Sequence, residues 1–587
     1  MKAHRTPSLV NPRDPTHRAA LAAGYSWRTL DWALATASEP FATRAHRTAH
    51  AELAAIRADR RTSPVDAWMR DAFICNLAKG RAEYMTDQQA RLTAQTSSDD
   101  LLEWLNRTLV SLEGKPFRFT DKRPRSDQLR GFLARSRCPI WWRRQLRRAV
   151  VQLREDIGIK RGEICAATQQ AYVTNDTLAR HTARIKSNEA LMEATVLENE
   201  NGQCFTLAEL IEKSPSAKPI RRGELMTRLR GCEELAESSG HRGVFLTLTA
   251  PSRFHSSPMA GGKNPAFDGS TPREAQDWLR NKWARARSRI QRTGLSMYGF
   301  RIAEPHHDGC PHWHMLLWVK PGDLWRIVLA IKRAWLKDGG DEPGARAHRC
   351  KAMLMHGGSA TGYVAKYIAK NIDDACGVAV EGHLDSDPQG HNTSSKTGGT
   401  AARVAAWASA WGIRQFQAIG QPPVTVWREL RRIDAAHQQG CTEPMAQAFK
   451  AVNKREGANA CWATYVRAQG GLMTGRHYRL RVASAQIEMD GRYERQERQF
   501  PLGVFDVAAP DVCHLSNRQE WRPKGSWDRE PILLTAPIPP QFLIEKGRMV
   551  ANPEHAKWVA AKPAEHSHAA DPPWTCVNNC TELPGDI

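Results

Sequence analysis

Residues 298–318 constrain the fold of this chain more than any other stretch. Two apolar runs flank the turn pair Asp308-Gly309, and this pattern predicts a β-hairpin. Side chains alternate between the two faces of a strand, so His312 and His314 share one face. Folding back at the turn brings Glu304, on the first strand, towards the two histidines. The hairpin therefore presents two imidazoles and one carboxylate on one side of a sheet.

This donor set predicts a metal site. Two nitrogen ligands, one oxygen ligand and open positions suit Mg²⁺ or Mn²⁺ holding a phosphate group. A zinc site built from Cys310, His312 and His314 is the alternative, but no second cysteine stands at ligand spacing. The neighbouring His306 and His307 are interpreted as loop residues rather than ligands.

A second group of chemically capable side chains follows about fifty residues later. Tyr363 and Tyr367 are four positions apart, a spacing that places both on one face of a helix expected over residues 362–371. Lys366 and Lys370 form a parallel row beside them. The pattern offers two phenols and two cations on one helix.

Together these motifs resemble those of the HUH endonucleases, and within them the replication gene A proteins of bacteriophages. Residues 244–255 resemble the first-strand motif of that family, and within them residues 245–249 alternate apolar and hydroxyl side chains. The run Glu304-x-His-x-Asp-Gly-x-Pro-His312-Trp-His314 resembles its metal motif. Tyr363-x-x-x-Tyr367 resembles the two-tyrosine nucleophile motif. Order and spacing agree over about residues 240–430.

The resemblance implies a metal-dependent DNA nicking and rejoining enzyme that initiates rolling-circle replication of phage DNA. A tyrosine, Tyr363 or Tyr367, would attack single-stranded origin DNA and form a 5′-phosphotyrosine. The cation on His312, His314 and Glu304 would polarise the scissile phosphate. We expect Lys366 and Lys370 to hold phosphates or to assist proton transfer.

Two other functions use the same residues. A two-tyrosine HUH transposase or relaxase would carry the same site and act on different DNA ends. A non-catalytic, zinc-containing DNA-binding protein would use the histidines only structurally.

Composition supports a nucleic-acid partner. The 587 residues include 84 Lys and Arg against 62 Asp and Glu, a net charge of +22 that favours a polyanion. Thirteen scattered cysteines indicate reduced thiols. The sequence shows neither a signal core nor an apolar run of membrane length, so we expect the bacterial host cytoplasm and no membrane partner. The sequence has no Gly-x-x-x-x-Gly-Lys-Ser/Thr loop, so a host helicase is expected to open supercoiled origin DNA.

We predict an α+β fold with an HUH-type antiparallel sheet core flanked by helices. The expected parts are a flexible N-terminus (1–25), a helical region (26–240), the endonuclease core (241–435), an accessory region (436–530) and a partly disordered tail (531–587).

Within the core, Thr271 and Glu274 predict a capped helix that runs to about Thr293. Apolar side chains line one face of this helix, and arginines occupy the remainder. Those arginines fit either a solvated surface or contacts to a DNA backbone.

Overall fold

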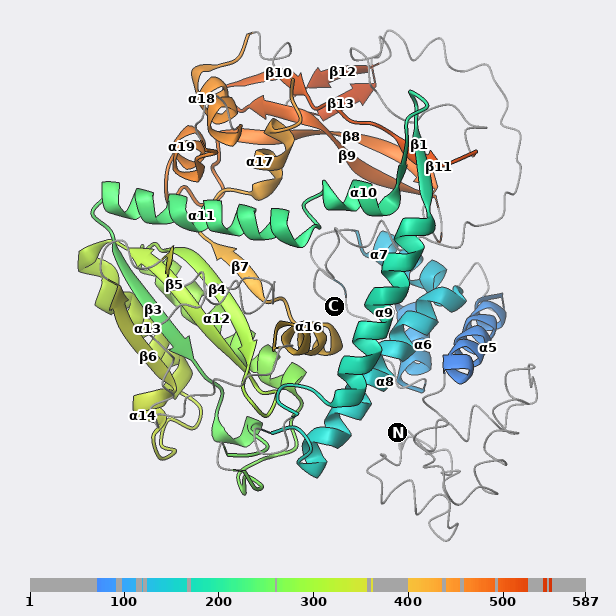
Figure 1. Ribbon diagram of the computed structural model, residues 1–587, viewed down its shortest axis with the longest axis vertical. Coiled ribbons are helices and arrows are strands. Elements are labelled where there is room, and N and C mark those ends of the chain that lie inside the picture. The colour runs from blue at the N-terminus through green and yellow to red at the C-terminus, as the bar shows by residue number, and fades with distance from the viewer. Residues whose placement is uncertain are drawn as a thin grey trace. The chain divides into compact units, whose positions relative to one another are not determined.

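The computed structural model describes most of the chain from Asp71 onwards (Figure 1). The described residues are 71–90, 98–111, 119, 124–165, 170–258, 261–355, 361–362, 400–434, 440–453, 459–490, 493, 495–525, 542–545 and 548–551. The chain divides into two compact units. Residues up to Ile157 belong to the first, and most residues from Gly158 onwards belong to the second.

The described part of the first unit is helical, as the sequence predicts. It contains α5 (Asp71–Ala90), α6 (Ser98–Ser111), α7 (Arg125–Ser136) and the greater part of α8 (Pro139–Arg161). These helices bury one apolar cluster that includes Met85, Leu105 and Trp142. The Trp142 indole N–H donates to the Ser136 carbonyl at 2.7 Å, so this ring both packs and anchors the start of α8.

The second unit begins with helices and one small sheet. Helix α9 (Asn175–Ala194) leads into β1 (Val196–Asn199) and β2 (Cys204–Thr206), followed by α10 (Leu207–Glu212) and α11 (Lys218–Ser238). Strand β1 also pairs with β11 (Trp521–Pro523).

The β1–β2 hairpin departs from the helical pattern expected over residues 26–240. Its turn contains Asn201-Gly202, a pair that favours tight turns, and Gly202 has a φ of 74°. The Asn199 side chain accepts the backbone N–H groups of Asn201 and Gln203. These local interactions stabilise the turn and end the helical pattern.

A five-stranded antiparallel sheet forms the centre of the second unit. Its strands are β3 (Arg242–Leu248), β4 (Tyr298–Pro305), β5 (Pro311–Val319), β6 (Cys350–Met355) and β7 (Phe416–Ile419), in the order β6-β3-β5-β4-β7. The predicted hairpin is confirmed as β4 and β5, with Glu304 opposite His312. The strand expected from residue 348 begins at Cys350, because α14 (Ala345–His348) occupies the preceding residues.

Helices pack on both faces of this sheet. On one face, Phe245, Phe300 and Leu316 join a core with α11, α17 (Val424–Leu430), α18 (Glu443–Val452) and α19 (Trp462–Ala468). On the other face lie α12 (Pro272–Arg292) and α13 (Leu324–Leu336), where the Trp313 indole N–H donates to Gln276 of α12 at 2.9 Å. The predicted capping box of α12 is present at Thr271 and Glu274. The fold is therefore α+β, with helices on both sides of an antiparallel sheet.

The C-terminal part adds a second five-stranded sheet. Strands β8 (Leu480–Asp490), β9 (Arg495–Asp506), β10 (Ala509–Leu515), β12 (Phe542–Glu545) and β13 (Arg548–Ala551) lie in the order β10-β9-β8-β13-β12. Strands β12 and β13 fall inside residues 531–587, the tail predicted to be partly disordered, whose other residues lie outside the described part. Within the described residues, no helix has both the length and the apolar character needed to cross a membrane.

Candidate metal centre

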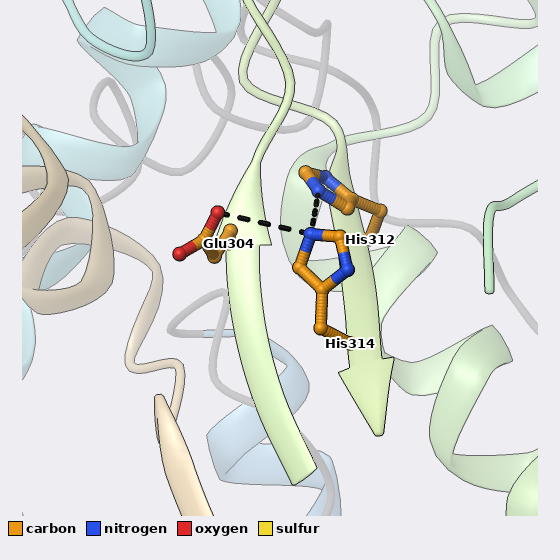
Figure 2. A group of neighbouring side chains, drawn as sticks. All are labelled: Glu304, His312 and His314. Atoms are coloured by element: carbon orange, nitrogen blue, oxygen red, sulfur yellow. Dashed lines mark hydrogen bonds and ion pairs between the residues drawn. The ribbon is translucent and has the colours of Figure 1, made fainter. Parts of the chain in front are cut away.

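Three side chains of the β4–β5 hairpin converge on one point (Figure 2). The Nε2 atoms of His312 and His314 are 2.9 Å apart, and His314 Nε2 lies 3.9 Å from Glu304 Oε2. One ligand atom from each of the three residues lies within 4.8 Å of the other two. Glu304 and His314 are buried, at 1% and 5% exposure, and His312 is half-buried. The arrangement predicted from strand alternation is therefore present in the structure.

The hairpin turn fixes the register that brings these groups together. The His306 N–H donates to the Cys310 carbonyl at 2.8 Å, and the Gly309 N–H donates to the His306 carbonyl at 2.9 Å. Gly309 has a φ of 83°, a left-handed conformation that glycine adopts without a steric penalty. A shift of one residue would turn both histidines to the opposite face of the sheet.

Neighbouring side chains orient the His314 ring. Thr247 Oγ1 on β3 lies 3.2 Å from His314 Nδ1, and the Phe245 ring stacks on the imidazole with centroids 5.4 Å apart. With Nδ1 engaged by the hydroxyl, Nε2 points towards His312 and Glu304. Such contacts set the tautomer and direction of a metal-binding histidine.

A buried acid anchors the turn to the loop after β3. Asp308 Oδ2 lies 3.1 Å from His255 Nδ1 and accepts the Ser256 N–H at 3.0 Å. Its Oδ1 accepts the Cys310 N–H at 3.0 Å. Burial alone would lower the pKa of His255, but the neighbouring Cys310 and Asp308 side chains outweigh burial and raise it well above its ordinary value. Burial would raise the pKa of Asp308, yet the charge and hydrogen bond of His255 hold it far below the usual range.

His306 lies closer to the site than its interpretation as a loop residue suggests. Its ring centroid is 4.0 Å from that of His312 and 5.0 Å from that of His255. Burial, together with the charge of His255, lowers the pKa of His306 to about 3. Its Nε2 is buried and has no hydrogen-bond partner among the described residues. The ring therefore packs against His312 as a neutral imidazole.

The donor set fits a divalent cation. The facing Nε2 atoms of His312 and His314 can share at most one proton, and a buried carboxylate stands beside them. Nitrogen and oxygen donors of this kind bind divalent transition-metal ions, including Mn²⁺, well. Of the described residues, Glu304, His312 and His314 make up the one group with metal-binding spacing, and Cys310 is not a member. The zinc arrangement through Cys310 therefore receives no support from the geometry.

The predicted nucleophiles and their lysines cannot be compared with the structure. Tyr363, Lys366, Tyr367 and Lys370 lie outside the described residues, and their roles remain predictions. The two described residues just before them, 361–362, are helical.

Thr361 is held by α11. Its backbone N–H donates to Glu233 Oε2 at 3.2 Å, and its hydroxyl donates to the same oxygen. Helix α11 packs on the sheet face that carries Phe245 and Leu316. His312 and His314 lie at alternate positions from Leu316 on β5 and so share that face. The entry to the tyrosine segment is thus anchored to the helix that covers the histidine face.

Sequence reasoning did not assign roles to two residues near the site. Thr247 contacts His314 directly, and Lys351 on β6 stands opposite Thr247 in the sheet register, on the same face. Lys351 is exposed. The alternation of hydroxyl and apolar residues in β3 hinted at Thr247, but nothing local identifies Lys351, because its position depends on the pairing of β6 with β3.

The fold and site define a mixed α+β protein with a two-histidine, one-carboxylate centre on an antiparallel hairpin. The family model of the bacteriophage replication gene A protein (GPA) matches residues 68–375, and the chain belongs to this family.

Relatives with curated names agree with this membership. The chain is 35% identical over 465 residues to the replication protein of Haemophilus phage HP1, covering 78% of this chain and 55% of that one. It is 38% identical over 360 residues to the replication gene A protein of Escherichia phage 186, covering 60% and 50%. A probable replication endonuclease from a prophage-like region of Salmonella typhi is 33% identical over 363 residues, covering 60% and 44%. The chain spans about half the length of these relatives. No solved structure matches it.

Proposed function

We propose that this protein is a metal-dependent endonuclease and strand transferase that nicks single-stranded origin DNA to initiate rolling-circle replication of phage DNA. The observation that carries the proposal is the convergence of Glu304, His312 and His314 on one point of the sheet. Relatives named as replication proteins and replication endonucleases support the same reaction class.

The reaction is a transesterification at phosphorus. The phenolic oxygen of Tyr363 or Tyr367 loses its proton and attacks the scissile phosphate. The bond from phosphorus to the 3′ oxygen breaks, and that oxygen gains a proton and becomes a free 3′-hydroxyl. The DNA 5′ end is left as a phosphotyrosine. Because the new ester retains the energy of the old one, rejoining needs no ATP.

The centre on the hairpin would support this step electrostatically. Glu304, His312 and His314 would hold Mg²⁺ or Mn²⁺, which would supply Lewis-acid stabilisation of charge on the phosphate oxygens. Thr247 would keep the His314 imidazole pointed at the ion. The anchoring of Thr361 to Glu233 supports a tyrosine helix on the same sheet face.

Two tyrosines allow two successive transfers. While one phenol holds the displaced 5′ end, the other could cut the regenerated origin after a round of synthesis. The new 3′-hydroxyl would then attack the first linkage and release a circle. Lys366 and Lys370 would hold phosphates or assist proton transfer, and a host helicase would open the supercoiled origin.

The test is covalent capture. The protein is incubated with Mn²⁺ and supercoiled phage DNA carrying the origin, and protein-linked nicked DNA is measured on denaturing gels. The Tyr363→Phe, Tyr367→Phe double variant should lose the covalent product. The matched control Tyr478→Phe, in a half-buried tyrosine of the accessory region, should retain it. Covalent product from the double variant would exclude the tyrosine mechanism.

The names of the relatives favour replication over a transposase or a relaxase with the same site. Peptide mapping of the DNA-linked residue would decide which tyrosine acts. A protein that binds zinc tightly, cuts no DNA and is unaffected by both tyrosine substitutions would instead match the non-catalytic alternative.

A further inference from the structure

The second half of α12 is strongly and uniformly basic. After Asp277, six basic residues and no acidic residue follow before the helix ends at Arg292. Five of the six are exposed: Arg280, Arg285, Arg287, Arg289 and Arg292. The sixth, Lys282, is buried and pairs with Asp338 at 3.6 Å. The exposed arginines therefore form a cationic surface, called here the α12 arginine surface.

Helical geometry arranges these arginines in two rows. Arg280 and Arg287 are seven residues apart along one edge of the exposed face, whereas Arg285, Arg289 and Arg292 follow the other edge. Each row is about 10 Å long at 1.5 Å per residue. Between the rows lie the exposed side chains of Asn281, Ala284, Ser288 and Gln291. The helix thus presents a shallow polar strip bordered by positive charge on both sides.

Within the described residues, carboxylates leave most of this surface without neutralising charge. Asp277, near the start of α12, pairs with Arg273 at 3.4 Å and with the exposed Arg280 at 3.3 Å, and Asp338 pairs with the buried Lys282. No ion pair to Arg285, Arg287 or Arg289 is formed by any side chain in the described part of the chain. Their charge is available to an external anion.

A buried cation beneath the helix, Arg301, lies in the same positive field. Burial, and then the charges of Arg414 and Arg280, lower the pKa of Arg301 to about 9. Arg414 is itself exposed, so it extends the positive region beyond α12. Several cations close together without anionic partners repel one another and destabilise the folded protein. Such a group is typical of a surface that binds a polyanion.

The chemistry of the surface favours duplex over single-stranded DNA. Proteins that hold single strands stack bases on exposed aromatic rings. On α12 the aromatic residues are turned away from solvent: Trp283 is buried, and the indole N–H of half-buried Trp278 donates to Asp338 at 2.6 Å. A charged helix that exposes no aromatic ring of its own fits a partner whose bases are enclosed and whose phosphates are exposed.

The surface is separate from the candidate metal centre. Helix α12 packs on the sheet face of Trp313, whereas His312 and His314 point to the opposite face. DNA bound at the histidines and DNA bound at α12 would therefore lie on opposite faces of the sheet. We propose that the α12 arginine surface docks the duplex flanking the nicking site through backbone phosphates. This inference rests on the proposed function for the choice of DNA as the polyanion and for the nicking site that the duplex flanks.

The test measures the salt dependence of DNA binding. A fluorescein-labelled 30-base-pair duplex of arbitrary sequence is titrated with the full-length protein in EDTA, at several salt concentrations. The variant is Arg285→Gln, Arg287→Gln, Arg289→Gln; glutamine has a helix propensity similar to that of arginine. If each arginine contacts one phosphate, the slope of log K against log salt should fall in magnitude by about 2.7. Affinity at low salt should fall more than ten-fold.

A matched control removes the same net charge elsewhere. Arg180→Gln, Arg184→Gln, Lys186→Gln changes three exposed cations of α9, a helix that also carries Asp176, Glu189 and Glu193. We expect the control to keep the wild-type slope, and we expect the α12 variant to lose more affinity for duplex than for a single strand of equal length. Equal losses in both triple variants, or an unchanged slope in the α12 variant, would overturn the inference.

The result of the duplex-binding measurement does not depend on whether the protein nicks DNA. Because EDTA removes the metal, a wild-type protein that never cuts DNA can still show the α12-dependent slope. Conversely, the α12 variant should still form covalent product on a short single-stranded origin oligonucleotide if the endonuclease proposal is correct.

Discussion

Replacing Asp308 with asparagine tests how the hairpin turn is held. The Asp308 side chain is fully buried and accepts three hydrogen bonds, from His255, the Ser256 N–H and the Cys310 N–H. Asparagine can keep the bond from Cys310, but its NH₂ group then faces the His255 and Ser256 donors. Hydrogen bonds to a charged group contribute about 1.5–3 kcal/mol each. Losing two of them should lower the free energy of unfolding by about 3–6 kcal/mol, close to the cost of breaking a buried ion pair.

The effect should depend on pH in a defined way. The folded pKa of Asp308 is depressed, so its stabilisation is present above the unfolded value of about 3.9 and is lost as pH falls below it. The folded pKa of His255 is raised, so its stabilisation is complete below about 6.5 and is lost as pH rises towards the folded value. The difference in free energy of unfolding between wild type and Asp308→Asn should therefore be largest between about pH 4 and 6.5.

Urea unfolding followed by tryptophan fluorescence, at pH 6 and pH 9, measures the loss of stability and its dependence on pH. The control is Asp176→Asn, since that carboxylate is 52% exposed and pairs with Arg180 on the surface of α9. Its loss should cost under about 1 kcal/mol. The reasoning would be refuted if Asp308→Asn lost less than about 1 kcal/mol of unfolding free energy at pH 6, or if it lost more at pH 9 than at pH 6.

Three further changes address the centre and the sheet. Thr247→Val removes the oxygen beside His314 Nδ1 and should weaken Mn²⁺ binding about 10–100-fold, measured by calorimetry, with stability little changed. Glu304→Gln removes a charged ligand and should weaken Mn²⁺ binding further than Thr247→Val; equal affinity to wild type would exclude Glu304 as a ligand. Gly299→Ala places a Cβ 1.9 Å from the Leu316 carbonyl oxygen, at a residue whose φ is 153°. This change should lower the free energy of unfolding by more than about 3 kcal/mol in urea. The control Gly322→Ala, which has open space around it, should be nearly neutral.

The sequence alone determined the local features of this protein. Alternation along residues 312–318 and the Asp308-Gly309 turn predicted the hairpin, and the Thr271–Glu274 pair predicted the start of α12. These features depend on side chains within a few positions of each other, so their signals are readable in a short window of sequence. The Asn201-Gly202 turn carried an equally local signal, but its neighbours have helical composition and the hairpin was not predicted.

Only the tertiary structure decided which distant groups meet. Asp308 and His255 are 53 positions apart, Thr361 and Glu233 are 128 apart, and Lys351 reaches the histidine face through the pairing of β6 with β3. Likewise, the position of the α12 arginines opposite the metal centre follows from which sheet face the helix buries. Such relations depend on the packing of whole elements, and many alternative packings share the same local patterns. The sequence could therefore name the three candidate metal ligands, whereas the network that holds them required the folded chain.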